Sequence, residues 1–152
     1  RDQYIVTSKG QQAIFGLSHA EGGLLWEMGG TTPTMQQTSG TAFGIVHGPR
    51  IEGDRIYVFD NTPAAQRLSR AVAFDIDYTQ QTYTEAWSYT GEWSSVVLGN
   101  EEPTRENGEL ISFGLDSGFL ELNADGQNTM QIEGELSGYV HYIPTLSRVL
   151  EN

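Results

Sequence analysis

Three histidines, His19, His47 and His141, supply the side chains best suited to nucleophilic or proton-transfer chemistry near neutral pH. They lack the close spacing of a zinc site, and the chain has no cysteine to provide a thiolate ligand. His47 follows the apolar run 42–46 and is expected near the end of an inner strand; His19 is expected in an exposed turn and His141 in a terminal strand. The sequence therefore predicts no metal site and no cofactor. It makes His47 a candidate nucleophile, with an ordinary strand or loop histidine as the alternative.

Few side chains in this sequence are suited to holding an anion beside such a histidine. Arg50 and Arg70 would supply local positive charge, and Asn61 would supply an amide. We predict substrate binding for these three residues. The alternative is structural: Arg70 would pair with a carboxylate such as Asp60 or Asp75 and fix a turn, and Asn61 would satisfy neighbouring backbone groups.

The overall charge argues against several classes of partner. The chain has 20 Asp and Glu residues against 8 Lys and Arg, which gives a net charge of −12. Such a surface repels phosphate backbones and anionic lipids, so we expect no nucleic-acid partner. No apolar run approaches the roughly 20 residues that span a bilayer, so the chain is not expected to cross a membrane. An anionic substrate would need local donors that override this field.

Short apolar or alternating segments, bounded by glycine, asparagine, aspartate or proline, recur along the 152 residues and predict an all-β protein. We expect each segment to be a strand and the polar stretch 29–40 to be a loop. The predicted strands cover residues 4–8, 13–17, 24–28, 42–47, 55–59, 70–76, 82–89, 95–98, 109–113, 118–122, 130–133 and 139–143.

These strands repeat with a long period of roughly 45 to 60 residues, the range of four-stranded β-propeller blades. Blade strands are expected within residues 4–28, 42–89 and 93–133, and a closing strand at 138–145 is expected to complete the first blade. Residues 1–152 would then form a single propeller fragment of about three blades, half of a six-bladed ring. A small β-sandwich or barrel is the alternative.

Several segments occur in the order found in one enzyme family. They include W-x-M-G-G at 26–30, F-D-N at 59–61, S-R-A-V at 69–72, L-G at 98–99 and N-G-E-L-I at 107–111. The remaining matches lie at residues 4–9, 13–14, 47–58, 75–77 and 84–89. Taken in order over nearly the whole chain, these segments resemble the C-terminal half of the arylsulfate sulfotransferases. The resemblance implies a β-propeller whose N-terminal half is missing here.

The resemblance also implies a reaction and a set of site residues. The family moves a sulfuryl group from an aryl sulfate to a phenol through a sulfohistidine, and His47 matches the attacking histidine. Lys9 falls where the family has an arginine that binds the sulfonate, and lysine keeps the charge but lacks the planar fork. Two further ligands, spaced His-x-Asn, would precede residue 1. Catalysis would therefore require completion by the missing half.

Two other functions remain open from the sequence. One is a non-catalytic propeller module whose open blade edges pair with another copy or another chain. The other is a ligand-binding propeller with aromatic side chains at a channel mouth, for which the candidates are Tyr57, Tyr89, Trp93 and Tyr142. An extracytoplasmic location, secreted or periplasmic, is expected.

Overall fold

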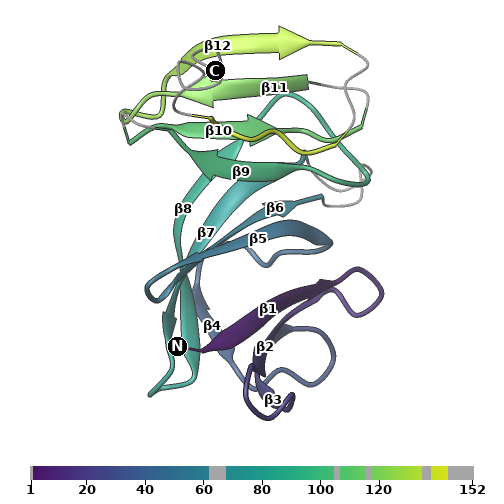
Figure 1. Ribbon diagram of the computed structural model, residues 1–152, viewed down its shortest axis with the longest axis vertical. Helices are drawn as coiled ribbons and strands as arrows, with labels where there is room; N and C mark the ends of the chain where they lie inside the picture. The colour runs from purple at the N-terminus through teal and green to yellow at the C-terminus, as the bar shows by residue number, and fades with distance from the viewer. Residues whose placement is uncertain (1, 62–67, 105–106, 116–117, 135–137, 144–152) are drawn as a thin grey trace, which may run out of the picture.

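The computed structural model describes residues 2–61, 68–104, 107–115, 118–134 and 138–143. Within these residues the regular structure is strand alone, which confirms the all-β prediction. The strands form sheets that follow one another along the long axis of the molecule, in chain order (Figure 1).

The first sheet is an antiparallel meander of β1 (Gln3–Ser8), β2 (Ala13–Ser18) and β3 (Leu24–Gly29). Side chains alternate between its two faces, as the strand period of two requires. Trp26 lies across Gly16 of the neighbouring strand, where a Cβ would be 2.2 Å from the indole ring. The indole therefore packs against the backbone of β2, and its Nε1 donates to Gln3 at 3.0 Å.

The middle sheet contains β5 (Val46–Glu52), β6 (Arg55–Asp60), β7 (Arg70–Asp77) and β8 (Thr82–Thr90), all antiparallel. A further strand, β4 (Gln36–Ser39), pairs in parallel with β8. The prediction of a loop over residues 29–40 is therefore wrong for 36–39. The segment Gln-Gln-Thr-Ser has no apolar alternation, and it becomes a strand because the edge of β8 offers unpaired backbone groups.

The third sheet contains β9 (Asn100–Pro103), β10 (Glu109–Ser112), β11 (Gly118–Leu122) and β12 (Asn128–Glu133). The strand predicted at residues 95–98 is not formed, and β9 begins two residues later. The apolar run was misleading because Leu98 has a φ of +62° and Gly99 a φ of +100°, and both values break an extended backbone.

The closing strand predicted at 138–145 is not found in its described part, residues 138–143. This segment runs beside the third sheet, where side chains take up its backbone groups. The Asn100 side chain donates from Nδ2 to the carbonyl of Val140 at 2.8 Å and accepts at Oδ1 from the N–H of Val140 at 3.0 Å. The Ser112 hydroxyl donates to the carbonyl of Gly138. Residues 144–145 lie outside the described part of the chain.

Two apolar clusters join the three sheets. The first, which includes Ile14, Met28, Ile56 and Phe74, lies between the first and middle sheets. The second, which includes Phe59, Phe113 and Leu122, lies between the middle and third sheets, with Phe59 and Phe113 edge to face at 5.3 Å. Strand β5 of the middle sheet contacts both β1 of the first sheet and β9 of the third. Strand β5 thus lies at the junction of all three sheets.

Candidate functional site

His47 lies at this junction, one residue after the start of β5, and is partly exposed. Its cross-strand partner is Phe59, and a bulge between His47 and Arg50 interrupts the pairing with β6. Gly48 has a φ of +57°, and a Cβ there would lie 2.8 Å from the side chain of Asn100. Glycine therefore lets the bulged strand pass close to β9, and the bulge sets the direction of the residues beside it.

Asn61 is the hydrogen-bond partner of the His47 ring. Its Oδ1 lies 2.5 Å from Nδ1 of His47, and the residue is only 1% exposed. Its Nδ2 donates to the carbonyl oxygens of Ser95 at 3.0 Å and Leu98 at 2.8 Å. The backbone N–H of Asn61 donates to the carbonyl of Ile45 at 2.6 Å. Asn61 thus joins the strand that carries His47 to the loop that leads into the third sheet.

That loop, residues 91–99, is itself fixed by buried hydroxyl groups. The backbone N–H of Ser95 donates to Oγ of Ser69 at 2.7 Å, and the Ser69 hydroxyl donates to the Ser95 carbonyl at 3.1 Å. Both serines are buried. Leu98, whose carbonyl accepts from Asn61, is held at a positive φ that is uncommon for a leucine. The two carbonyls that face Asn61 therefore occupy fixed positions.

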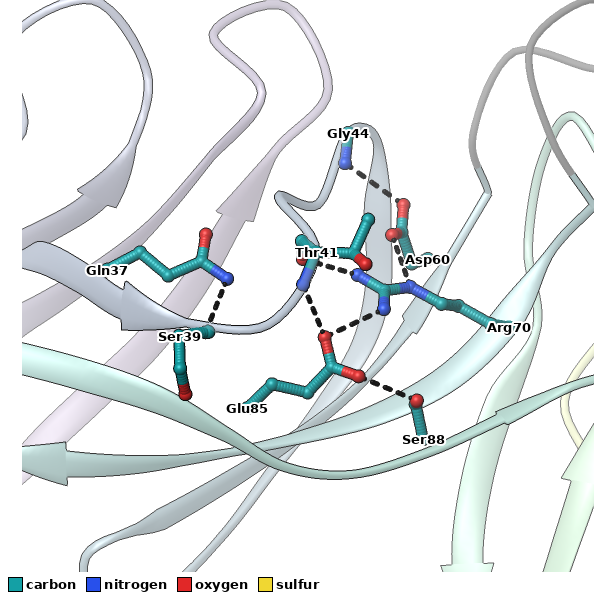
Figure 2. Close-up of polar contacts among 8 residues, drawn as sticks. All are labelled: Gln37, Ser39, Thr41, Gly44, Asp60, Arg70, Glu85 and Ser88. Carbon is teal, nitrogen blue, oxygen red and sulfur yellow. Dashed lines mark hydrogen bonds and ion pairs between the residues drawn. The ribbon is translucent and has the colours of Figure 1, made fainter.

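Arg70 anchors the segment 40–44, which leads into β5. Its Nε donates to Asp60 at 3.1 Å, its Nη1 to Glu85 at 3.0 Å and its Nη2 to the carbonyl of Thr41 at 2.8 Å (Figure 2). The side chain is 5% exposed. The structural alternative considered for Arg70, a pair with Asp60, is formed, and its guanidinium is directed at protein acceptors.

Glu85 completes this anchor from β8. It accepts hydrogen bonds from the backbone N–H of Thr41 at 2.9 Å and from the hydroxyl of Ser88 at 2.7 Å, in addition to Arg70 (Figure 2). Burial by itself would raise the pKa of Glu85, but the hydrogen bonds from Ser88, Thr41 and Arg70 lower it. The carboxylate is therefore kept ionised opposite Arg70.

Arg50 is occupied by a second charged cluster, between β5 and the third sheet. Its Nη2 lies 2.6 Å from Glu101, its Nη1 lies 2.5 Å from Glu52, and its guanidinium stacks 3.8 Å from the centre of the Tyr57 ring. Burial and the adjacent Glu101 carboxyl raise the pKa of Glu109 to about 9. Arg50 therefore counters the charge of buried carboxyl groups beside the junction.

The remaining candidate cations and histidines lie elsewhere. Lys9 is exposed at the end of β1, and within the described residues its ammonium forms no ion pair. His19 faces Asp2 at 3.1 Å on the surface of the first sheet, and His141 pairs with Glu102 beside the third sheet. The structure thus brings His47 into contact with Asn61 and pairs Arg70 with Asp60, the residue before Asn61; within the described residues no hydrogen bond or ion pair joins Lys9 to them.

Over the described ranges, no group of three or more His, Cys, Asp or Glu side chains could hold a metal ion. Nor does any helix in that part of the chain have the length and apolar character needed to cross a membrane.

Comparison with known protein families identifies the family of this chain. The sequence model of the arylsulfotransferase (ASST) family matches residues 1–135. The chain belongs to the arylsulfotransferase family. No curated protein matches it.

Family motifs that are far apart in the sequence of this chain meet at one place in the fold. His47, the F-D-N segment, the S-R-A-V segment and the L-G pair contribute the hydrogen bonds described above. Sequence reasoning missed Ser95, which it placed in a strand, and the pairing of Asn61 with His47. The order of the motifs was the signal in the sequence that indicated the family. It did not indicate that these segments contact one another.

Proposed function

We propose that this chain carries a sulfuryl-transfer site in which His47 is the nucleophile. The observation that carries the proposal is the His47 ring itself: Nδ1 is bound to a buried amide while the residue remains partly exposed. An imidazole held by one nitrogen has its other nitrogen available to attack. The family match supports sulfur as the electrophile.

The proposed reaction has two displacements at sulfur. A ring nitrogen of His47 bonds to the sulfur of an aryl sulfate while the sulfur–oxygen bond breaks, and the aryloxide leaves with that electron pair. A phenol then attacks the sulfohistidine, the nitrogen–sulfur bond breaks, and the electron pair returns to the imidazole. The proton lost by the phenol is taken up by the departed aryloxide through solvent. No oxidant or reductant is required.

We further propose that the three sheets are blades of a β-propeller. The middle and third sheets each contain a four-stranded antiparallel meander, and the first strands of successive sheets adjoin, as in a ring of blades around an axis. The first sheet has three strands among the described residues. A histidine at the start of β5 would then face the axis of the ring.

The proposed reaction also needs hydrogen-bond donors or cations that bind the sulfonate oxygens. Arg50 and Arg70 each face protein carboxylates, whereas Lys9 is exposed. We propose that the sulfonate is held by groups from another part of the ring, supplied by further blades or by a second copy of the chain. This fits the requirement for oriented donors around developing charge.

Transfer from a chromogenic aryl sulfate to phenol tests the function. When further blades are supplied, or at concentrations where the chain pairs with a second copy, we expect transfer by the wild type and by His141→Gln, since the His141 side chain is exposed and pairs with Glu102. We expect His47→Gln to fall to the uncatalysed rate. If the anion donors come from a second copy, the rate per chain rises with protein concentration. Transfer by His47→Gln at the wild-type rate would show that His47 is not the nucleophile.

A non-catalytic assembly module is the second candidate function. The observation that favours it is the engagement of both arginines with carboxylates, together with exposed apolar side chains on the outer faces of the end sheets. Association of the chain without sulfuryl transfer, at any concentration and with added blades, would favour this candidate.

A further inference from the structure

The buried amide of Asn61 has one possible orientation. Its Nδ2 faces two carbonyl oxygens, those of Ser95 at 3.0 Å and Leu98 at 2.8 Å. A rotation that exchanged Nδ2 and Oδ1 would place the amide oxygen against both carbonyls and leave buried acceptors without donors, which is costly. Oδ1 of Asn61 is therefore the atom that faces His47.

This orientation determines where the proton of His47 resides. An amide oxygen only accepts, so the His47 atom 2.5 Å away must donate a hydrogen bond. A ring carbon in that place would need a longer separation, more than about 3.3 Å. The neutral ring must then carry its hydrogen on Nδ1 and a lone pair on Nε2.

We propose that Asn61 is a positioning residue that holds neutral His47 as its Nδ1–H tautomer, and that Nε2 is the nitrogen that attacks sulfur. The tautomer rests on the described geometry alone, whereas its use in attack rests on the proposed function. When Nε2 bonds to sulfur, the ring becomes cationic and keeps its Nδ1–H. The hydrogen bond to Oδ1 of Asn61 is then charge-assisted, so it is stronger after attack than before.

The chemistry of the partner separates His47 from the other two histidines. His19 and His141 each have Nδ1 beside a carboxylate, Asp2 and Glu102 respectively, and both lie on exposed surface. At His47 the partner is instead a neutral amide, which the carbonyls of Ser95 and Leu98 hold in one orientation.

The loop 91–99 contributes to this control, because it supplies both carbonyls that orient the amide. Leu98 adopts its uncommon positive φ where its carbonyl meets Asn61, and Gly99 follows with a Cβ position only 2.4 Å from the Phe59 ring. Backbone strain of this kind persists only where surrounding contacts impose it. Here these contacts include the packing on Phe59 and the Ser69–Ser95 hydrogen bonds.

Nitrogen-15 NMR of the imidazole rings in the intact chain tests the tautomer directly. The His47 signals are assigned by their loss in His47→Gln, and His19 and His141 serve as internal references. At a pH where His47 is neutral, we expect a protonated Nδ1 and a non-protonated Nε2. A proton on Nε2, which is the form that free histidine favours in water, would overturn the proposal.

Two variants of Asn61 separate positioning from a merely structural role. In Asn61→Ala, we expect folded protein to lose the exclusive Nδ1–H form; an unchanged tautomer in folded protein would contradict the proposal. In Asn61→Asp an oxygen replaces Nδ2 beside the Ser95 and Leu98 carbonyls, so only folded protein is compared. There Nδ1 still faces an acceptor oxygen, and we expect Nδ1–H to be retained, the imidazolium to persist to higher pH, and the transfer rate at neutral pH to fall at least several-fold. If Asn61→Ala does not fold, the wild-type spectrum still decides.

The outcomes also separate this inference from the proposed function. A protonated Nδ1 without any transfer by the wild type would retain the tautomer and reject the sulfuryl-transfer role. Transfer that depends on His47, together with a proton on Nε2, would support the sulfuryl-transfer role and reject the proposed tautomer.

Discussion

At the scale of single residues, Glu109 has the most perturbed environment around the junction. It lies on the face of β10 that meets the middle sheet, close to Glu101 and Arg50. Burial and the Glu101 carboxyl raise its pKa to about 9, so it is protonated at neutral pH. One shared proton and one arginine thus allow neighbouring carboxyl groups to coexist in a partly buried site.

Stability should depend on pH through this group. The folded state keeps the Glu109 proton up to about pH 9, whereas an unfolded chain releases it near its ordinary pKa of 4.5. The contribution of Glu109 is therefore fully present below that lower pKa and is lost as pH rises through this window. Glu109→Gln mimics the protonated form, so we expect its unfolding free energy, relative to wild type, to be higher at pH 8 than at pH 5. Urea unfolding at both pH values checks this, and an equal difference at both would contradict it.

The residue scale also shows what the sequence could and could not predict about the site. His47, Asn61 and Arg70 were found because their types suit anion chemistry and their motifs match a family. The contacts of Arg70 have a physical reason that the sequence pattern did not specify: a buried guanidinium must be paired, and Asp60 and Glu85 are its partners. The hydrogen bond from His47 to Asn61 depends on a bulge and a long-range loop, which no local pattern encodes.

At the scale of elements, segment 40–44 sets where β5 begins and hence where His47 lies. Arg70 of β7 holds this segment through Thr41, and Asp60 of β6 accepts from the N–H of Gly44 at 3.0 Å (Figure 2). Gly40 is part of the same contact, because a Cβ there would lie 2.2 Å from Glu85. The start of β5 is thus fixed from three strands of its own sheet, β6, β7 and β8.

Removing the Arg70 side chain should release this segment. Arg70→Ala removes the guanidinium that faces the buried Asp60 and the half-buried Glu85, so we expect a loss of about 3–5 kcal/mol in unfolding free energy. Arg55→Ala is the matched control, because its pair with Asp75 is 41% and 54% exposed and should contribute no more than about 1 kcal/mol. Chemical denaturation of both variants measures the difference. Equal losses would mean that Arg70 is not a structural anchor.

Element prediction succeeded where strands alternate and failed where tertiary contacts decide. Strands β6, β7 and β11 appear close to their predicted ranges because their apolar periodicity matches burial against a neighbouring sheet. The polar strand β4 was missed because its formation depends on the free edge of β8. Residues 138–143 were misassigned because the Asn100 and Glu102 side chains occupy backbone groups that a strand would pair.

At the scale of the whole molecule, both end sheets have an outer face with exposed apolar side chains. On the first sheet, Tyr4 and Val6 point away from the core shared with the middle sheet and are 55% and 41% exposed. On the third sheet, Met130 and Ile132 of β12 are 38% and 43% exposed. Such faces favour association with another sheet.

We expect these faces to drive concentration-dependent association of the chain. Val6→Glu and Met130→Glu place a charge on the two outer faces and should weaken it, whereas Ile51→Glu, in the β5–β6 hairpin, should not. Sedimentation velocity over a range of concentrations measures the change. If Ile51→Glu weakens association as much as the other two, the outer faces are not the contact.

The nucleophilic role of His47 is tested most directly by trapping the covalent intermediate. After incubation with an aryl sulfate and no acceptor, tandem mass spectrometry should locate one sulfuryl group on His47, and later addition of a phenol should remove it. His47→Gln should carry none, and His19→Gln should be modified like the wild type. A sulfuryl group on another residue, or none on His47 under conditions where transfer is observed, would contradict the account.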